Sequence, residues 1–515
     1  MSGSFDVIVI GSGIGGLTAA LKAAREGAEV LVLEAGKQFG GYLNPFRRGK
    51  FLFDPGLHYI GESGQGGRFR MLLDRIGLQE IQFNELTPDG FDTYSFPNYQ
   101  VSMGRGLEHF RDRLIADFPR EEKNLHRFFA LIYKVGETLR AMMKVRGLTS
   151  LLAAARHLPL YFKWGRATLA EMLDAYFQDH QLKAALAGPC GDIGLPPNKL
   201  HGFIHLNILL HYSGGGYFPK GGTHAMRDAY VTALEAHGAT LRRFTVVDKI
   251  LTRGGRVTGV RTDEGQVFEA PVVISNAQID TTMDMLPAES VPKKLQRKVA
   301  GMEYSLGSCC LFLGVKDTCD TSVIGDRNIW HYGSTDIDGL YQEIFDGAIP
   351  DGSSFFLSVP SLKDPSGGHA PQGHRAIEMV TLAHPRPFAQ WAGGKTMKRG
   401  AEYEALKQGI ADRLIEVAER YIPGLKAAVV SCEVSTPNTN MSFVRARHGN
   451  IYGPAQTPEQ SGPSRFSTEG PVKGLFLCGA SIVSAGILPC AASGYWAGSA
   501  ATRFLARERP RIAVG

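Results

Sequence analysis

The first apolar runs of the chain alternate with glycine-rich turns in a pattern that predicts a strand, a helix and a second strand. The run FDVIVI predicts a buried strand over Phe5–Ile10, and the small and apolar residues after it predict a helix from about Gly15 to Arg25. Gly27 ends that helix, and Glu29–Leu33 predicts a second buried strand. This segment is therefore predicted to form a βαβ unit.

The turn between the first strand and the helix carries three glycines in the spacing GxGxxG. Gly11 permits a tight turn, Gly13 lets backbone amides approach a pyrophosphate at the helix N-terminus, and Gly16 lets the helix lie close to the strand. Glu34, at the end of the second strand, can accept two hydrogen bonds from an adenosine ribose. Because the motif lies between a predicted strand and a predicted helix, we expect a dinucleotide-binding half rather than a bare glycine turn.

The rest of the chain alternates further strands and helices over a length that exceeds one hydrophobic core. A strand pair is predicted over Phe91–Met103 and an amphipathic helix over Leu107–Leu131. A helix over Gly221–His237 leads into a strand over Thr240–Ile250. The other predicted elements are strands at 256–262, 266–269, 272–277, 309–315, 353–359, 376–383 and 475–478, and helices at 402–421 and 490–507.

Composition favours a globular protein, with 43% apolar and 21% charged residues among 515. A net charge of +6 is modest for this length and does not predict a nucleic-acid partner. Apolar runs stay shorter than the roughly 18 residues that cross a membrane, so we expect a cytoplasmic protein, free or peripherally attached to a membrane. The seven cysteines are odd in number, lack metal-ligand spacing and are predicted to be reduced.

Positive charge is concentrated in one segment, residues 134–170. It contains one acidic residue, Glu137, and seven basic ones: Lys134, Arg140, Lys144, Arg146, Arg156, Lys163 and Arg166. Leu, Met and aromatic residues lie between these charges, a mixture that suits the interface of an anionic bilayer. A helical lid with a solvated basic face is the alternative interpretation.

Several motifs beyond the βαβ unit carry a resemblance to a known family. Gly40 and Gly41 follow the ribose acid, and FDPGLHYIG follows them. Further along come DIGLPP from Asp192, YFPKGG from Tyr217, HGNIYGP from His448 and the segment GLFLCGASIVSAGILPCAASGYWAG. Together they resemble the amine oxidase, phytoene desaturase and protoporphyrinogen oxidase superfamily, and most of all its branch of phytoene desaturases, carotenoid isomerases and retinol saturases.

This resemblance implies bound FAD and a set of residues that hold it. In the family, the backbone at Val247 would hold the adenine, and the helix after Gly479 would point its N-terminus at the isoalloxazine. One departure is that Ala480 and Ser481 stand where many members have an acidic residue. His58 and Tyr59 are the candidates for lining the catalytic site. The candidate cofactor-binding residues are Gly11, Ser12, Gly13, Gly15, Gly16, Glu34, Ala35, Gly40, Gly41, His58, Val247, Asn276, Gly479, Ala480 and Ile487.

The expected fold class is α/β, with a Rossmann-like FAD-binding domain of the amine oxidase type and a mixed-sheet substrate domain. We expect the FAD-binding domain to be discontinuous, and the basic segment to form a helical lid or a membrane contact. The expected boundaries are 1–75, 220–290 and 435–515 for the FAD-binding domain, 76–130, 171–219 and 291–434 for the substrate domain, and 131–170 for the basic segment.

The resemblance implies an oxidoreductase acting on C=C bonds of a long hydrophobic polyene or isoprenoid, by desaturation, saturation or isomerisation. The substrate itself, the electron donor or acceptor and the oligomeric state stay open. Two alternatives keep the fold. One is an amine oxidase acting on a C–N bond, which would commonly use a lysine near the flavin. The other is a non-catalytic lipid- or prenyl-binding protein, in which the glycine turn tends to be degraded. His201, His205 and His211 allow a metal interpretation, since the first two are four residues apart on a predicted helix, although a packed or substrate-facing helix suits them better.

Overall fold

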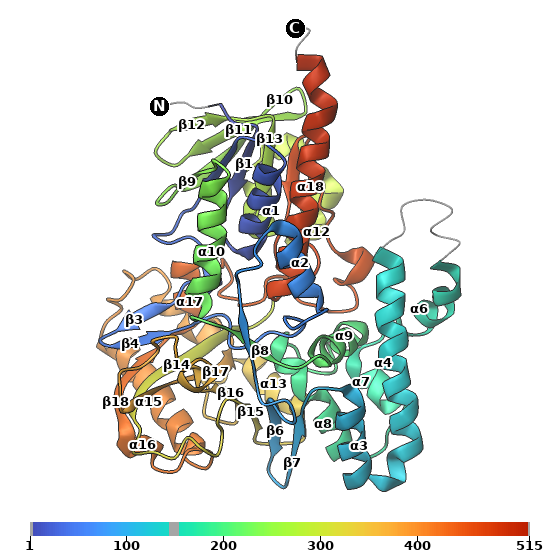
Figure 1. Cartoon of the computed structure of the whole chain (residues 1–515), viewed down its shortest axis with the longest axis vertical. Helices are drawn as coiled ribbons and strands as arrows, with labels where there is room; N and C mark the ends of the chain where they lie inside the picture. The colour runs from blue at the N-terminus through green and yellow to red at the C-terminus, as the bar shows by residue number, and fades with distance from the viewer. Residues whose placement is uncertain (1–3, 144–153, 513–515) are drawn as a thin grey trace.

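A five-stranded parallel sheet forms the upper part of the protein in Figure 1, with strand order β19-β13-β1-β2-β9. The structure is a computed structural model that describes residues 4–143 and 154–512. The strands are β1 (Val7–Ile10), β2 (Val30–Leu33), β9 (Thr240–Arg242), β13 (Val272–Ser275) and β19 (Leu475–Leu477). Layers cover both faces of this sheet, so its central strands are continuous apolar runs.

Alternate residues of β1 face these two layers. Val7 and Val9 pack towards the helices α1 (Ile14–Arg25), α10 (Thr223–Ala236) and α18 (Ile487–Ile512). Ile8 and Ile10 pack towards a three-stranded antiparallel sheet. That sheet consists of β10 (Val247–Arg253), β11 (Arg256–Thr262) and β12 (Val267–Glu269). The predicted βαβ unit is therefore the centre of a layered domain.

A seven-stranded mixed sheet lies below in Figure 1, with strand order β18-β14-β17-β16-β15-β6-β7. β15 and β6 pair in parallel, and all other neighbouring strands of this sheet pair antiparallel. α15 (Ala401–Ala418) packs on this sheet through an aliphatic cluster. The strands are β6 (Asp92–Phe96), β7 (Tyr99–Met103), β14 (Gly307–Lys316), β15 (Asn328–Tyr332), β16 (Ser354–Ser358), β17 (His374–Ala383) and β18 (Val429–Val434).

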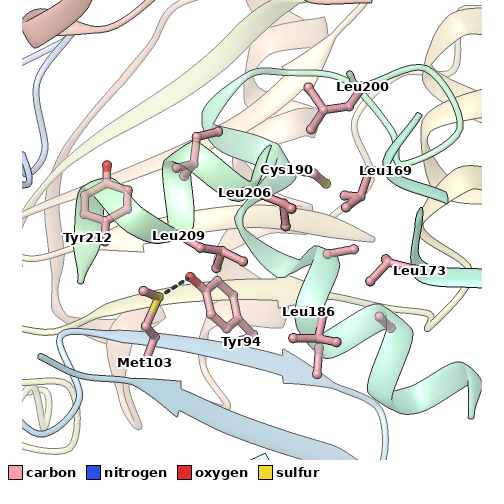
Figure 2. Packing of buried hydrophobic residues seen from close by; sticks show 14 of the residues in the cluster. Tyr94, Met103, Leu169, Leu173, Leu186, Cys190, Leu200, Leu206, Leu209 and Tyr212 are labelled. Atoms are coloured by element: carbon pink, nitrogen blue, oxygen red, sulfur yellow. Dashed lines mark hydrogen bonds between the residues drawn. The ribbon is translucent and has the colours of Figure 1, made fainter. Parts of the chain in front are cut away.

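A group of helices covers the β6 end of the mixed sheet. Figure 2 shows part of their shared core, where leucines from several helices surround Tyr94 and Tyr212 lies at the edge of the group in this view. The Tyr94 hydroxyl contacts the Met103 sulfur at 3.8 Å, which ties β6 to β7. The helices are α3 (Leu107–Asp117), α4 (Glu122–Met143), α6 (Leu158–Trp164), α7 (Leu169–Asp174), α8 (His180–Ala187), α9 (Gly202–Tyr212) and α13 (Ile337–Asp346).

Short elements connect the two sheets. The strands are β3 (Phe46–Arg48), β4 (Phe51–Phe53), β5 (Phe83–Glu85) and β8 (Tyr217–Pro219), which pair as β3 with β4 and β5 with β8. The helices are α2 (Arg68–Ile76), α11 (Ile279–Asp284), α12 (Lys293–Ala300), α14 (Pro360–Lys363), α16 (Leu425–Ala428) and α17 (Pro437–Phe443). β4 packs its phenylalanines on β14, which brings the N-terminal segment onto the mixed sheet.

Two predicted elements differ from the structure. The predicted strand Thr240–Ile250 is divided into β9 and β10, which belong to different sheets, and Phe244 between them has a left-handed φ of 54°. The predicted helix Leu107–Leu131 is interrupted at Pro119, because proline lacks the amide hydrogen that would continue the helix. Both corrections concern breaks that lie inside amphipathic patterns.

All seven cysteines are free thiols, as predicted. Burial raises the pKa of Cys309 and Cys310 on β14, so the adjacent pair is less reactive than exposed thiols. Within residues 4–143 and 154–512 no helix is long and apolar enough to cross a bilayer. Lys144 and Arg146 of the predicted basic segment lie outside the described residues.

Candidate functional site

A cavity of about 2460 Å³ runs between the parallel sheet, the mixed sheet and the helical group. It is several times larger than the roughly 300–1,000 Å³ of an ordinary ligand pocket, so it has room for a dinucleotide and a second, long molecule. Both candidate catalytic residues, His58 and Tyr59, line it. So do the candidate cofactor-binding residues Gly11, Ser12, Gly13, Gly15, Glu34, Ala35, Gly40, Gly41, Val247, Asn276, Gly479, Ala480 and Ile487.

Gly16 differs from the other candidates because it lies behind the cavity wall. A Cβ atom at this position would lie 2.0 Å from the Gly11 carbonyl oxygen, a distance at which two atoms overlap. The absence of a side chain thus lets α1 start directly against the end of β1. Gly16 shapes the turn rather than contacting a ligand.

Asn276 fills the space between the two glycine-containing segments. A Cβ at Gly13 would lie 2.8 Å from its amide nitrogen, and one at Gly15 or Gly479 would lie 2.6 or 2.7 Å from its amide oxygen. The backbone of Asn276 is fixed by a 2.9 Å hydrogen bond from its N–H to the Ile10 carbonyl. The turn at the N-terminus of α1 thus keeps a bare backbone beside the cavity, a cradle that suits a pyrophosphate.

Glu34 joins three segments at the end of β2. Its carboxylate accepts hydrogen bonds from the Ser12 N–H at 2.9 Å and the Gly36 N–H at 2.7 Å. The Ser12 hydroxyl also donates to Glu34 and accepts from the Gly40 N–H at 3.1 Å. Each carboxylate oxygen has two acceptor sites, so these three bonds leave one site for a ribose hydroxyl, where the motif predicts two.

A buried arginine, Arg465, lies beside Ala480, where many members of the resembled family have an acidic residue. The Arg465 guanidinium donates to the Ala480 carbonyl at 2.5 Å and to the Pro454 carbonyl at 3.2 Å, and its side chain lines the cavity. Burial lowers the pKa of Arg465 to about 10, so it stays charged at neutral pH. Ser493 on α18 accepts from the Gly479 N–H at 2.8 Å, which fixes the turn before Ile487. This wall therefore presents a cation and a helix N-terminus instead of an acid.

His58 is held by a carboxylate from the mixed sheet. Its Nδ1 lies 2.8 Å from Oε2 of Glu378 on β17, and the other carboxylate oxygen accepts from the Asp54 N–H at 2.6 Å. Glu378 is 1% exposed, so both of its oxygens are satisfied by the segment that leads to His58. Because Nδ1 donates to Glu378, the Nε2 side of the ring is left for other partners.

Tyr59 belongs to an aromatic and acidic wall. Its ring stacks on Tyr212 with a centroid distance of 4.8 Å, and its hydroxyl donates to Asp192 Oδ2 at 3.3 Å. Behind it, the Lys363 ammonium donates to the His58 carbonyl at 2.7 Å and to Asn328 Oδ1. Burial lowers the pKa of Lys363 to about 7, partly opposed by the charge of Asp92. Lys363 therefore supports the His58 loop from behind and is not among the residues that line the cavity.

Sequence reasoning missed the residues that hold His58 and Tyr59. A signal was present for Glu378, because an acidic residue inside the apolar strand AIEMVTLA is rarely buried without a partner. Asp192 stood in the motif DIGLPP, but its spacing gave no indication that it meets Tyr59. Lys363 and Arg465 lie in segments without a recognisable pattern, so their positions could only come from the fold.

The histidines that allowed a metal interpretation have protein partners instead. His201 accepts from the Phe203 N–H at 3.0 Å and caps α9, and His205 Nε2 donates to the Leu186 carbonyl at 2.8 Å. His211 accepts from the Gly61 N–H at 3.1 Å. Among the described residues, no group of three or more potential ligands is arranged around a metal position.

Comparison with known proteins gives consistent matches along the chain. The model of the family "Flavin containing amine oxidoreductase" matches residues 14–486. The all-trans-retinol 13,14-reductase of Danio rerio is 28% identical over 509 residues, covering 93% of this chain and 83% of that protein. Prolycopene isomerase 1 of an Oncidium hybrid cultivar is 28% identical over 468 residues, covering 87% and 75%. The crystal structure of an oxidoreductase from Methanosarcina mazei superimposes with a TM-score of 0.65 at 17% identity, covering 96% of this chain and 100% of that one.

Proposed function

The chain belongs to the flavin containing amine oxidoreductase family and is an FAD-dependent oxidoreductase, and on this premise we propose that its substrate is a long apolar polyene or isoprenoid. The proposed reaction changes C=C bonds, by saturation, isomerisation or desaturation. Two relatives named after a retinoid and a carotenoid reaction, each similar over most of this chain, support this substrate class.

The shape and lining of the cavity are the observation that carries the proposal. From His58 and Tyr59 the cavity continues along α9 and reaches α4 and α6. Its wall in this direction is mostly aliphatic and aromatic, a surface that gains free energy by covering hydrocarbon. Its apolar lining residues are Leu139, Met142, Leu158, Tyr161, Phe162, Phe203, Ile204 and Ile208, and its polar ones are Thr138, Arg140, His201, Asn207 and His211.

The part of the cavity beside the N-terminus of α1 fits FAD, because glycines leave its backbone amides uncovered. A Cβ at Gly13 or Gly15 would overlap Asn276, so backbone amides at the N-terminus of α1 stay accessible for a pyrophosphate. Glu34 would hold the ribose, and the segment Gly479–Ala480 with Arg465 would lie along the remainder. When bound, the flavin supplies hydride chemistry at N5.

The residues around His58 and Tyr59 orient the substrate and exclude water. Phe356 packs on both, at centroid distances of 5.2 Å from His58 and 6.0 Å from Tyr59. The Glu378 carboxylate fixes the His58 ring through Nδ1, which leaves its Nε2 free to face another partner. A wall of stacked rings interrupted by a few fixed polar groups suits a conjugated hydrocarbon whose π-system lies flat against it.

The test is anaerobic incubation of the FAD-loaded protein with a panel of carotenoids, retinoids and unsaturated fatty acids, followed by chromatography and mass measurement. We expect one polyene class to be converted, with gain of a hydrogen pair in saturation, loss of a pair in desaturation, or an unchanged mass and a shifted retention in isomerisation. The fatty acids serve as the matched apolar control without extended conjugation. Failure to convert any polyene would contradict the proposed function.

Amine oxidation is the second candidate, because the family is named for it. Release of hydrogen peroxide from polyamines or amino acids, without polyene turnover, would establish it. The position of Lys363 disfavours this reaction, since its ammonium is held by His58 and Asn328 behind the cavity wall. A protein that binds no flavin at all would instead favour the lipid-binding alternative.

We also propose that the described part of segment 134–170 contacts an anionic membrane, from which an apolar substrate can enter. Phe162 on α6 is 79% exposed although it lines the cavity, and Lys163 and Arg166 beside it are exposed. An exposed aromatic side chain flanked by cations suits insertion into a headgroup layer. Arg140, which also lines the cavity, adds charge on the neighbouring α4.

Replacing Arg140, Lys163 and Arg166 with glutamine is expected to weaken binding to phosphatidylserine vesicles. Each cation near an anionic surface contributes about 1 kcal/mol, so the triple variant should bind on the order of 100-fold more weakly at low salt. Co-sedimentation at rising salt measures this. The matched control replaces the exposed basic residues Lys293, Lys294 and Arg297 of α12. Equal loss in both variants, or no loss in the first, would contradict the contact.

A further inference from the structure

Two carboxyl groups, one fully buried and one partly buried, lie beside Tyr59, and the proposed function does not use them. Asp92, the first residue of β6, is fully buried, and Asp192 ends the short helix Gly188–Asp192. Asp192 lines the cavity and is only partly covered, so its carboxyl reaches the space that a substrate would occupy. The Tyr59 hydroxyl donates to Asp192 Oδ2 at 3.3 Å. Asp92 is therefore the inner acid of the pair, and Asp192 is the outer acid, which faces the cavity.

The two acids have different protein partners. The Asn328 amide donates to Asp92 Oδ1 at 2.7 Å, and Lys363 in turn donates to the Asn328 oxygen. This chain turns the NH₂ group of Asn328 towards Asp92 and places a cation behind it, an arrangement that favours the ionised form of Asp92. Asp192 faces tyrosine hydroxyls and the cavity instead. Like charges so close together disfavour double ionisation, so the pair tends to keep one proton.

The electrostatics assign that proton to Asp192. Burial and the neighbouring charge of Asp92 raise the pKa of Asp192 to about 8. Burial also raises the pKa of Asp92, but hydrogen bonds and the Lys363 charge hold it at about 6. The Asn328 amide that donates to Asp92, with the Lys363 ammonium behind it, thus favours the charge on Asp92 and leaves the proton on Asp192.

The other titratable groups around Asp192 do not change this assignment. They are neutral where Asp192 titrates, because burial raises the pKa of each of them. These groups are Tyr59, Tyr94, Tyr212, Tyr332, Tyr452 and Cys190.

We propose that the Asp192 carboxyl donates a proton to a carbon of the polyene, and that Asp92 is a positioning residue that keeps this proton on Asp192. The inference rests on the proposed function and deepens it, because a proton donor suits saturation or isomerisation and not desaturation. Tyr59 holds the Asp192 carboxyl towards the cavity through its hydroxyl.

The proton transfer balances in both reactions. The O–H bond of Asp192 breaks, a C–H bond forms from the π electrons of the double bond, and an allylic cation and the Asp192 carboxylate remain. In isomerisation the cation rotates and returns a proton to Asp192, with no change of oxidation state. In saturation the cation is quenched by a hydride from a two-electron donor of the reduced-flavin class, and Asp192 regains a proton from water.

The substitution Asp192→Asn tests the donor, because the amide has nearly the same shape and cannot deliver the proton. We expect polyene conversion to fall by at least about 100-fold with flavin content unchanged. In D₂O a saturated wild-type product should carry one solvent deuterium at the carbon that Asp192 protonates. Asp117→Asn is the matched control, since Asp117 accepts from the Tyr99 hydroxyl at 2.8 Å in an exposed pair away from the cavity. Unchanged turnover in Asp192→Asn, a saturated product without solvent deuterium or a desaturated product would overturn the proposal.

A second measurement does not depend on turnover. Infrared difference spectra of the FAD-loaded protein should show a protonated carboxyl at pH 7 that is absent in Asp192→Asn. Asp92→Asn removes the neighbouring charge, so this carboxyl should lose its proton at lower pH than in the wild type, and the fall of conversion with rising pH should move with it. A pH profile that Asp92→Asn leaves in place would refute the positioning role. If no polyene is converted at all, the proposed function fails, whereas an Asp192 already ionised at pH 7 overturns this inference alone.

Discussion

Replacing Gly16 with alanine is expected to reduce bound flavin to less than about a tenth of the wild-type content. The added Cβ would lie 2.0 Å from the Gly11 carbonyl oxygen, and backbone atoms on both sides cannot rotate away as a side chain would. α1 must then move from the end of β1, which opens the turn whose amides face the cavity. Overpacking of this kind costs roughly 1–3 kcal/mol, and here the strain is located in the turn that would bind the cofactor. Flavin absorbance per protein and the thermal midpoint measure the effect.

Gly409→Ala is the matched control for this substitution. Gly409 lies within α15, and a Cβ there would meet no atom within 4 Å. Alanine in a helix restricts the unfolded chain, so this variant should be more stable by about 0.5–1 kcal/mol and keep its flavin. Full flavin content in Gly16→Ala would contradict this prediction, because it would show that α1 can move away from β1 without loss of cofactor binding.

Replacing Asp54 with alanine should destabilise the protein by about 3–5 kcal/mol, the range measured when one partner of a buried ion pair is removed. The Asp54 carboxylate is fully buried and lies 2.8 Å from His369 Nε2. It also accepts hydrogen bonds from the N–H and hydroxyl of Thr223, at the start of α10. These contacts join the parallel-sheet domain to the segment before β17. Urea unfolding measures the loss.

The loss should depend on pH. Burial alone would lower the pKa of His369, but the hydrogen bond and charge of Asp54 outweigh burial and raise it. A histidine whose pKa is higher in the folded than in the unfolded state stabilises the fold fully at pH values below its unfolded pKa of about 6.5. This stabilisation is lost as the pH rises through the pKa of the folded state. The difference in unfolding free energy between the wild type and Asp54→Ala should therefore be largest in mildly acidic buffer and smaller in alkaline buffer.

An exposed ion pair supplies the comparison for Asp54. Asp89 is 75% exposed and lies 3.7 Å from Arg327, so Asp89→Ala should cost less than about 1 kcal/mol at any pH. If Asp54→Ala cost no more than this surface variant, the buried cluster would contribute nothing to the joint between the domains.

The βαβ unit was predictable because its pattern is local. Apolar strands, glycine spacing and the helix stop all lie within a few residues of the elements they define, and α1 begins one residue before the expected start. The predicted strand Thr240–Ile250 was wrong as a single element, because an apolar and basic pattern does not reveal that the chain leaves one sheet for another. The helix over Leu107–Leu131 was wrong for the opposite reason: Pro119 was visible, but the amphipathic pattern on both sides of it was stronger.

The candidate site was predictable only in part, because its partners come from distant segments. His58 and Tyr59 follow from a motif that can be recognised by itself. Glu378, which holds His58, is 320 residues away along the chain. Asp192 approaches Tyr59 across 133 residues. Pairings of this kind depend on how the mixed sheet stacks under the parallel-sheet domain, which no spacing in the sequence records.

Asn276 also restricts the mutations that this chain can accept over evolutionary time. Its amide atoms lie within 2.8 Å of the places that a Cβ would take at Gly13, Gly15 and Gly479. A new side chain at any of these glycines therefore becomes tolerable only after Asn276 has been shortened. Shortening Asn276 first would leave a hole between the two segments that flank the cavity. Single steps away from this arrangement are thus disfavoured in either order, and we expect these four residues to be inherited as a block.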